Sequence, residues 1–395
     1  MGLPTSIRFV HAADFHLGSS FSNLSADKAE MRRMELFRSF IRVISLCKRE
    51  TPDFLLIAGD LFDSPILPAE IPRSVANAFA SIPNTHVVIA PGNHDPIYPK
   101  SIYDSQEWPK NVFVFSRTFE SIFFAEKRTR IWGGAFHNPR VPEPLIPADF
   151  VSSKERIEDS PDVLTLLVMH GEVCSGVGES LFYNPISLSK LAQSGMDYAA
   201  LGHIHERSAP QKAGATVYSY SGCPEPRGFD ELGVKGVYMG EIAKRNVRIR
   251  FVPTNERSYL PLSISVDACD TNQMVLERIL SVLQEKGGSS FSKDAYVLTL
   301  EGAVAGDFFI DLKRLHTDLL ASVFDVRVID HTRILLDYAV LRKEKSLRGA
   351  FADILCAEAE KERAAGNEAA AISCERGLSL GLKAFFGEVG LCEDQ

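Results

Sequence analysis

Short apolar runs recur along the first half of the chain, and a polar residue follows each of them closely. The runs occupy residues 7–13, 54–58, 86–90, 164–169 and 198–201. Continuous runs of Val, Ile and Leu are typical of strands that are buried on both faces. Because a helical stretch separates the first two runs, the pattern predicts a layered α/β domain whose helices cover its sheet.

The helical stretch covers residues 26–49. Apolar residues recur in it at spacings of three and four, which is the period of one helix face. These residues are Met31, Met34, Phe37, Ile41 and Ile44. We expect this stripe to be the buried face of an amphipathic helix.

Later segments change character and indicate domain boundaries. Residues 214–252 are β-rich with glycine turn signals, which predicts hairpins that close a first domain at residues 1–255. Residues 262–338 have the pattern strand, helix, strand, helix, strand, which is the size of a small α+β domain, and we assign it residues 256–340. The remaining segment, 341–395, is helical in propensity and predicts two helices joined by a turn.

Composition restricts the class of protein. Of the 395 residues, 45% are hydrophobic and 24% charged, which excludes a largely disordered chain. The net charge of −8 argues against binding nucleic acid by bulk charge and leaves room for a local basic groove. The seven cysteines form no CxxC pair, which favours a reducing, cytoplasmic location. We expect no signal peptide and no contact with a membrane, because no apolar run approaches roughly 20 residues.

Candidate site residues stand where the apolar runs end. Seven of them are candidate metal ligands, namely Asp14, His16, Asp60, Asn93, His170, His203 and His205, and the eighth is His94. Side chains two apart in an extended segment point the same way, so the pairs 14/16 and 203/205 can each face one cavity. Buried carboxylates are costly when unpaired, and a divalent cation removes that cost.

The ligand types narrow the choice of metal. Imidazole and carboxylate without thiolate suit Mn, Fe, Zn or Ni better than Ca or Mg. Seven ligands exceed the needs of one ion and fit two, so one carboxylate would bridge ions roughly 3.5–4 Å apart. Asp60 is the natural bridge, because Asp14 and His16 already form a pair on one side.

The order D-x-H, G-D, G-N-H-D, H and G-H-x-H resembles the calcineurin-like metallophosphoesterases. In detail the chain is similar to their DNA-repair nuclease branch, the Mre11 and SbcD type, and within it to a YhaO-like bacterial group. The motifs that carry this likeness are HAADFHLGSSF, AGDLFDS, APGNHD, MHGE and ALGHIHE. The resemblance covers residues 7–252 strongly. It implies a four-layer β-sandwich flanked by helices, with a small α+β capping domain and a helical tail.

The resemblance also implies roles for single residues. The implied ligands are, for one metal, Asp14, His16 and His205, for the other, Asn93, His170 and His203, and, as the bridge, Asp60. His94 would lie near the scissile phosphate and act on the leaving oxygen. The two ions would be Mn²⁺, with Fe, Zn and Ni as alternatives. The chain departs from some members at Asp63, where they carry a histidine, and this carboxylate could orient His94 or cap a turn.

Substrate and partners follow from the same resemblance. It implies a two-metal DNA exonuclease or endonuclease in a double-strand break repair complex with an SMC-like ATPase of the Rad50 or SbcC type. A homodimer is a further option. The expected DNA contacts are Arg227, Lys244, Arg245, Arg248 and Arg250. The expected docking stripe for the ATPase on the C-terminal helices is Leu347, Phe351, Ile354 and Leu355.

Two other functions stay open from the sequence. The same metal chemistry could act on nucleotides, cyclic nucleotides or phosphoproteins, although a small substrate needs neither the extra domain nor the helical tail. A non-catalytic scaffold with the same fold is the other alternative. Such scaffolds usually have eroded ligand sets, whereas this chain has the whole set.

Overall fold

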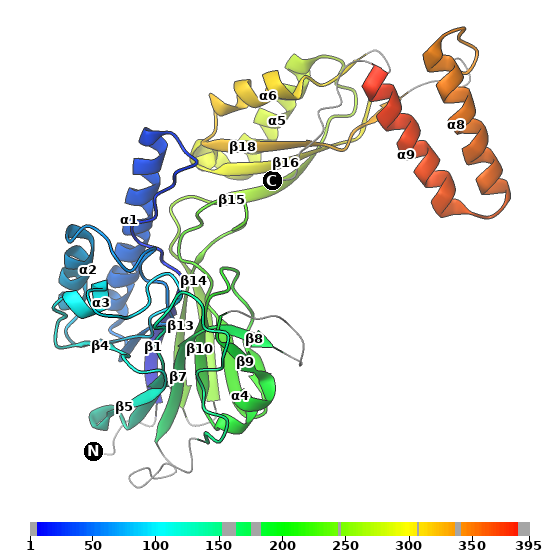
Figure 1. Ribbon diagram of the computed structural model, residues 1–395. Coiled ribbons are helices and arrows are strands. Elements are labelled where there is room, and N and C mark those ends of the chain that lie inside the picture. The colour runs from blue at the N-terminus through cyan, green and yellow to red at the C-terminus, as the bar shows by residue number, and fades with distance from the viewer. Residues whose placement is uncertain are drawn as a thin grey trace. The chain divides into compact units, whose positions relative to one another are not determined.

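The computed structural model describes residues 6–151, 163–174, 183–243, 246–305, 308–335 and 341–385. The chain divides into two compact units, Met1–Tyr259 and Leu260–Gln395 (Figure 1). Among the helices of the described residues, none combines the length and the apolar character that a membrane span requires.

The first unit contains two six-stranded sheets. One has the order β14 (Asn246–Pro253), β13 (Gly236–Ala243), β1 (Ser6–Ala12), β2 (Phe54–Ile57), β3 (His86–Ile89) and β4 (Val112–Val114). The other has the order β11 (Gln211–Ala213), β12 (Thr216–Tyr220), β10 (Tyr198–Gly202), β7 (Leu164–His170), β6 (Thr129–Gly133) and β5 (Glu120–Phe124). Strands β1 to β4 are parallel, so their carboxyl ends lie at one edge of the first sheet. Smaller elements are α3 (Ile102–Ser105), β8 (Glu172–Cys174) and β9 (Pro185–Ser187).

The sheets pack face to face, which explains the continuous apolar runs. Phe9 of the first sheet and Leu166 of the second belong to one core and are both 0% exposed. On the outer faces, α1 (Ala26–Glu50) and α2 (Glu70–Ala80) cover the first sheet, and α4 (Leu188–Ser194) covers the second. The expected four-layer α/β fold is therefore confirmed, and the five runs predicted as strands are strands.

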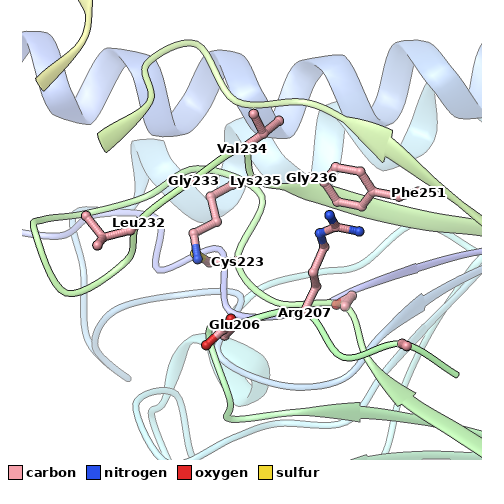
Figure 2. Close-up of a pocket in the computed structure, with 11 residues that line it drawn as sticks. Glu206, Arg207, Cys223, Leu232, Gly233, Val234, Lys235, Gly236 and Phe251 are labelled. Atoms are coloured by element: carbon pink, nitrogen blue, oxygen red, sulfur yellow. The ribbon is translucent and has the colours of Figure 1, made fainter. Parts of the chain in front are cut away.

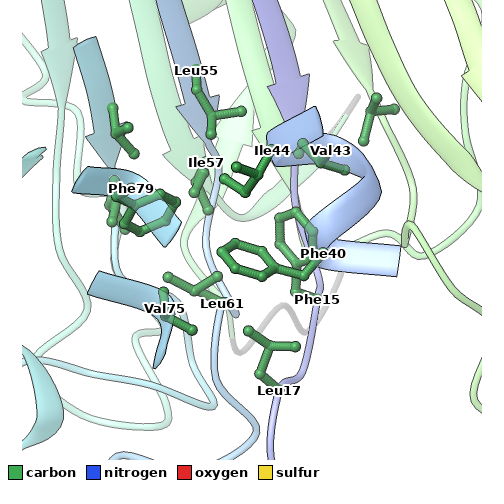
Figure 3. Close-up of a cluster of buried hydrophobic side chains, with 14 of the residues drawn as sticks. Phe15, Leu17, Phe40, Val43, Ile44, Leu55, Ile57, Leu61, Val75 and Phe79 are labelled. Carbon is green, nitrogen blue, oxygen red and sulfur yellow. The ribbon is translucent and has the colours of Figure 1, made fainter. Parts of the chain in front are cut away.

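Helix α1 has the predicted extent, but the predicted buried face is only partly right: Ile44 is buried and Phe37 packs against the core, whereas the other three residues of the stripe are exposed. Met31 and Met34 are 43% and 45% exposed. The buried face instead carries Phe40 and Val43, which pack against strand and helix residues of the core (Figure 3). Apolar spacing misplaced part of the buried face because two charged residues, Arg32 and Glu35, occupy inward positions.

Arg32 is 0% exposed and holds α1 to the loop after β12. Its guanidinium pairs with Glu35, donates to Glu225 Oε1 at 3.1 Å and donates to the carbonyl oxygen of Pro226. Arg257 pairs with Glu35 from the other side. These contacts satisfy the charges that the buried face of α1 carries, and they fix the start of the loop that contains Arg227.

Replacing Arg32 by methionine should lower the free energy of unfolding by about 3–5 kcal/mol, because two carboxylates then lose a buried partner. Urea unfolding of the variant and the parent measures this. The matched control is Arg33→Met, since Arg33 pairs with Glu30 at the surface and should cost less than about 1 kcal/mol. Equal losses in the two variants would contradict the role of the buried cluster.

The second unit begins with a three-stranded sheet of β15 (Tyr259–Ser265), β16 (Ala295–Glu301) and β18 (Asp325–Asp330). Helices α5 (Asn272–Gly287) and α6 (Leu312–Leu320) share a core with it. Two short strands, β17 (Ala303–Ala305) after β16 and β19 (Arg333–Leu335) after β18, form a separate parallel pair. The order of elements matches the expected small α+β domain, while its role as a capping domain stays a prediction.

Two helices end the described part of the chain, α8 (Leu347–Ala364) and α9 (Glu368–Phe385). The predicted apolar stripe of α8 is divided between two environments. Phe351 packs against the core that α8 and α9 share, whereas Leu347 and Ile354 are 76% and 68% exposed. The exposed half of the stripe is therefore available to a partner, and the other half is used within the chain.

Candidate metal centre

The predicted ligands lie at strand ends in both sheets of the first unit. The structure places Asp14 and His16 after β1, Asp60 after β2, Asn93 and His94 after β3, His170 at the end of β7, and His203 and His205 after β10. Loops at the carboxyl ends of parallel strands commonly gather into one site. Here the loops of two packed sheets meet, so residues far apart along the chain contact each other.

The backbone at these residues is not extended. Asp14, His16, Asp60 and His203 have φ values of 54°, 48°, 49° and 99°. Strand alternation, which predicted that residues 14 and 16 point the same way, does not apply to them, because β1 ends at Ala12. Left-handed turns direct these side chains inward instead, and each costs about 1–3 kcal/mol in a residue other than glycine. Such strain at several site residues is typical of functional sites.

Gly59 shows how closely the site is packed. Its φ is +94°, and a Cβ atom there would lie 2.2 Å from His170 Nδ1. Only glycine therefore allows the turn before Asp60 to pass under the imidazole of His170. The Gly-Asp pair of the sequence is thus part of the site's construction.

His16 and His205 face each other in a way that favours a cation between them. Their Nε2 atoms are 3.2 Å apart. His16 Nδ1 donates to Asp63 at 3.0 Å, and His205 Nδ1 donates to Glu231 at 2.7 Å. Because a carboxylate only accepts, both Nδ1 atoms carry hydrogen, and the facing Nε2 atoms present lone pairs when the rings are neutral. Asp14 completes this group, whose ligand atoms all lie within 4.8 Å of one another.

Asp60 lies between this group and a second one. Its Oδ2 is 3.7 Å from His16 Nε2 and 3.5 Å from His170 Nε2. His170 Nδ1 donates to the carbonyl oxygen of Ala58 at 3.0 Å, which leaves its Nε2 as an acceptor 2.8 Å from Asn93 Oδ1. Two acceptors at that distance again favour a shared cation.

The burial of the ionisable groups also favours a bound cation. It raises the pKa of Asp14 to about 7 and that of Asp60 to about 6. It also lowers the pKa of His170 to about 3, so this imidazole is neutral near pH 7. Neutral imidazoles and costly buried carboxylates are the donor set that a divalent cation stabilises.

His203 and His94 occupy the margins of the site. The ring of His203 lies 5.2 Å from the ring of His170, centre to centre, and its backbone N–H donates to Asp14 Oδ1 at 3.0 Å. His94 is 42% exposed in its side chain, and its Nδ1 donates to the carbonyl oxygen of Asp63 at 3.3 Å. His94 is also grouped with His16 and Asp60 within 4.8 Å. Its ring can therefore reach either a metal or a bound substrate.

Sequence reasoning missed Glu231, which orients His205, and expected Asp63 to act on His94, whereas it orients His16. Asp63 accepts from His16, not mainly from His94, and also pairs with Arg227 at 3.1 Å. Glu231 accepts from His205 and from the backbone N–H of Arg227 at 2.6 Å. Although burial raises the pKa of Glu231, its bond from His205 holds that pKa well below the usual range. The four-residue spacing of Arg227 and Glu231 was the available signal.

Asp95, the last residue of G-N-H-D, fixes the turn that carries Asn93 and His94. It is 0% exposed, and its carboxylate accepts from Gly92 N at 2.7 Å and from the hydroxyl of Tyr103 at 2.6 Å. Tyr103 was not identified from the sequence, because α3 is too short to show a period.

The residues expected to contact DNA do not all lie in the site. Arg227 lies in the site, paired with Asp63 and Glu231. Arg248 and Arg250 are on β14, the edge strand of the first sheet. Lys244 and Arg245 lie outside the residues that the structure describes. The contact of these residues with DNA stays a prediction.

The four-layer fold and the linked residue groups together indicate a binuclear divalent metal site in a metal-dependent phosphoesterase. Residues 7–207 match the calcineurin-like phosphoesterases, and the chain belongs to this family.

Similar proteins include a metallophosphoesterase, a DNA repair protein and a nuclease subunit. The metallophosphoesterase YhaO of Bacillus subtilis is 30% identical over 297 residues, covering 72% of this chain and 70% of that protein. The DNA double-strand break repair protein Mre11 of Methanococcus maripaludis is 25% identical over 252 residues, 60% of this chain and 63% of that protein. The SbcD component of the nuclease SbcCD of Escherichia coli O157:H7 is 23% identical over 295 residues, 62% of this chain and 67% of that protein.

Glu231→Gln should weaken metal binding about 10- to 100-fold, because the amide no longer provides the charge that orients and polarises His205. Calorimetric titration with Mn²⁺ and with Zn²⁺ measures the affinity. Asp230→Asn is the matched control, since Asp230 is the exposed neighbour in the same loop. Equal affinities for the parent and Glu231→Gln would contradict the orienting role.

Proposed function

We propose that this protein is a two-metal-dependent DNA nuclease that hydrolyses phosphodiester bonds, with Mn²⁺ as its metal. The observation that carries the proposal is the complete site, in which Asp60 lies between His16 and His170 and all three are at most 1% exposed. A scaffold without activity has no need to keep such a costly arrangement. The names of the Mre11 and SbcD relatives support DNA as the substrate.

We assign the ligands as two sets that share one carboxylate. The first set is Asp14, His16 and His205, which form one of the close groups. The second set is Asn93, His170 and His203, supported by the short distance from Asn93 to His170 and the ring contact between the two histidines. Asp60 would bridge the sets.

When bound, the two cations supply positive charge that neutralises phosphate oxygens and activates water. The chain's own residues do the rest. Asp63 and Glu231 hold His16 and His205 in the tautomer that presents Nε2. His94 donates through Nδ1 to a carbonyl oxygen, which leaves Nε2 to exchange a proton with the leaving sugar oxygen.

A protein partner is the second part of the proposal. The exposed Leu347 and Ile354 of α8 are suited to an SMC-like ATPase of the Rad50 or SbcC type. The α5–α6 domain would act as a cap that positions DNA. A reducing cytoplasm agrees with the free thiols of Cys47, Cys223 and Cys269.

Purified protein with Mn²⁺ should degrade end-labelled single-stranded DNA, and EDTA should abolish this. Parallel assays on bis-p-nitrophenyl phosphate, cyclic nucleotides and a phosphopeptide separate the substrate classes. If a small substrate is turned over faster than DNA, both with and without an ATPase partner, the protein is a phosphodiesterase or phosphatase and not a nuclease. No hydrolysis of any of them would favour the scaffold.

His94→Ala should keep both metals and lose about 10²–10⁴-fold in turnover, because proton transfer to the leaving oxygen is lost. Turnover on bis-p-nitrophenyl phosphate, whose leaving group needs little protonation, should fall less than turnover on DNA. The control is His137→Ala, since His137 is an exposed histidine whose Nδ1 also donates to a carbonyl oxygen.

Metal content measured on the same samples distinguishes the two possible roles of His94. If the His94→Ala protein loses a metal ion, His94 is a ligand and not the proton donor. Asp60→Asn is the reference for that outcome, because loss of the bridge should remove both ions.

A further inference from the structure

A cavity of about 450 Å³ lies beside the loop that follows His205. Its walls come from residues 206, 207 and 209, from residues 221, 223 and 232–236, and from Phe251 of β14 (Figure 2). None of the assigned metal ligands lines it. It is therefore a separate feature of the first unit, although it adjoins the metal centre along the chain.

Lys235 brings a buried positive charge to this cavity. The residue is 6% exposed, and its ammonium donates to the carbonyl oxygen of His205 at 3.1 Å. An ammonium has three donors, and within the described part of the chain this carbonyl is its one acceptor. The nearby carboxylate of Glu231 is already used by His205, Arg227 and Cys223. A buried ammonium with a single neutral partner favours an anionic ligand.

Arg207 adds a second cation from the opposite wall (Figure 2). Its guanidinium lies over the ring of Phe251, 4.3 Å from the ring centre. Stacking fixes the plane of the guanidinium and leaves its N–H edge free to donate. Among the described residues Arg207 has no carboxylate partner.

The remaining walls indicate what kind of anion fits. Leu232 and Val234 are 39% and 48% exposed and give an apolar rim next to Phe251. Glu206 is the one carboxylate among the lining residues, and it is exposed, so solvent screens its repulsion. A guanidinium and an ammonium suit a phosphate group, and the apolar rim suits a sugar or base attached to it.

We propose that this cavity is a second phosphate-binding site, separate from the metal centre, which takes a phosphate group of a nucleotide or of a nucleic-acid strand. If the source is a strand, the inference deepens the proposed nuclease function and rests on it, because the same strand would extend from the metals to the cavity. If the source is a free nucleotide, the site stands without that function. Lys235 connects the two sites, since its ammonium also holds the carbonyl of His205.

The test measures binding without catalysis. A fluorescein-labelled oligonucleotide with a 5′-phosphate is titrated with protein in EDTA, and fluorescence anisotropy gives the affinity. Arg207→Gln should weaken binding about tenfold and lower the slope against log salt by about one unit. Arg73→Gln, an exposed arginine on α2, is the charge-matched control and should bind like the parent.

Competition identifies the source of the phosphate. Displacement by inorganic phosphate supports a phosphate site. Equal displacement by AMP and by unlabelled oligonucleotide indicates a free nucleotide, whereas displacement by the oligonucleotide at far lower concentration indicates a strand. Lys235→Met should weaken the binding of every one of these probes. Arg207→Lys should recover part of the affinity that Arg207→Gln loses.

The result that overturns the proposal is equal binding of all phosphate probes by the parent and by Arg207→Gln. Arg207 is exposed, so Arg207→Gln should keep the fold, and its binding can be interpreted even if Lys235→Met does not fold. The outcome is also independent of catalysis. If the parent protein binds phosphate in EDTA but cleaves no DNA with Mn²⁺, the proposed nuclease function is refuted and the phosphate site stands. If it cleaves DNA but binds no phosphate probe in EDTA, only the phosphate site is refuted.

Discussion

The close packing of Asp14 and Asp60 among the imidazoles of the site is the constraint on which the first unit depends. Both carboxylates are 1% exposed, and acceptor atoms of His16 and His205 face each other at 3.2 Å. Water is largely excluded, so the charge and the lone pairs need positive charge at the centre of the group. Left-handed backbone at Asp14, His16 and Asp60 adds conformational cost. A rigid scaffold must hold such an arrangement, and the two packed sheets provide it.

The two sheets touch where the ligands meet. A Cβ atom at Gly202, the last residue of β10, would lie 1.9 Å from the carbonyl oxygen of Ala58, which follows β2. The carboxyl ends of two strands from different sheets are therefore in close backbone contact at this point. That approach explains how His203 and His205 reach residues of the first sheet. It also explains why the G-H-x-H motif that contains them begins with glycine.

Much of this could be predicted from the sequence, because it depends on local patterns. Buried strands have continuous apolar runs, so the layers could be predicted, and polar residues follow the strand ends, so the residues that cluster there could be predicted as candidate ligands. Charge pairing over long separations was not predictable. Arg32 and Glu35 occupy inward positions of α1 because Glu225 and Arg257 meet them there. In the same way, Asp63 has His16 as its partner 47 residues away, and no spacing rule connects them.

One loop, residues 222–236, carries two cations with different surroundings in a protein of net charge −8. Arg227 of this loop is neutralised by Asp63 and Glu231, so it stiffens the metal centre and adds little net field. Lys235 has no such carboxylate among the described residues, and its ammonium contacts the carbonyl of His205, whose imidazole is held by Glu231 of the same loop. His205 is thus fixed at both its ring and its backbone by one segment. One hydrogen bond therefore links Lys235, which lines the cavity, to the backbone of His205, a candidate metal ligand.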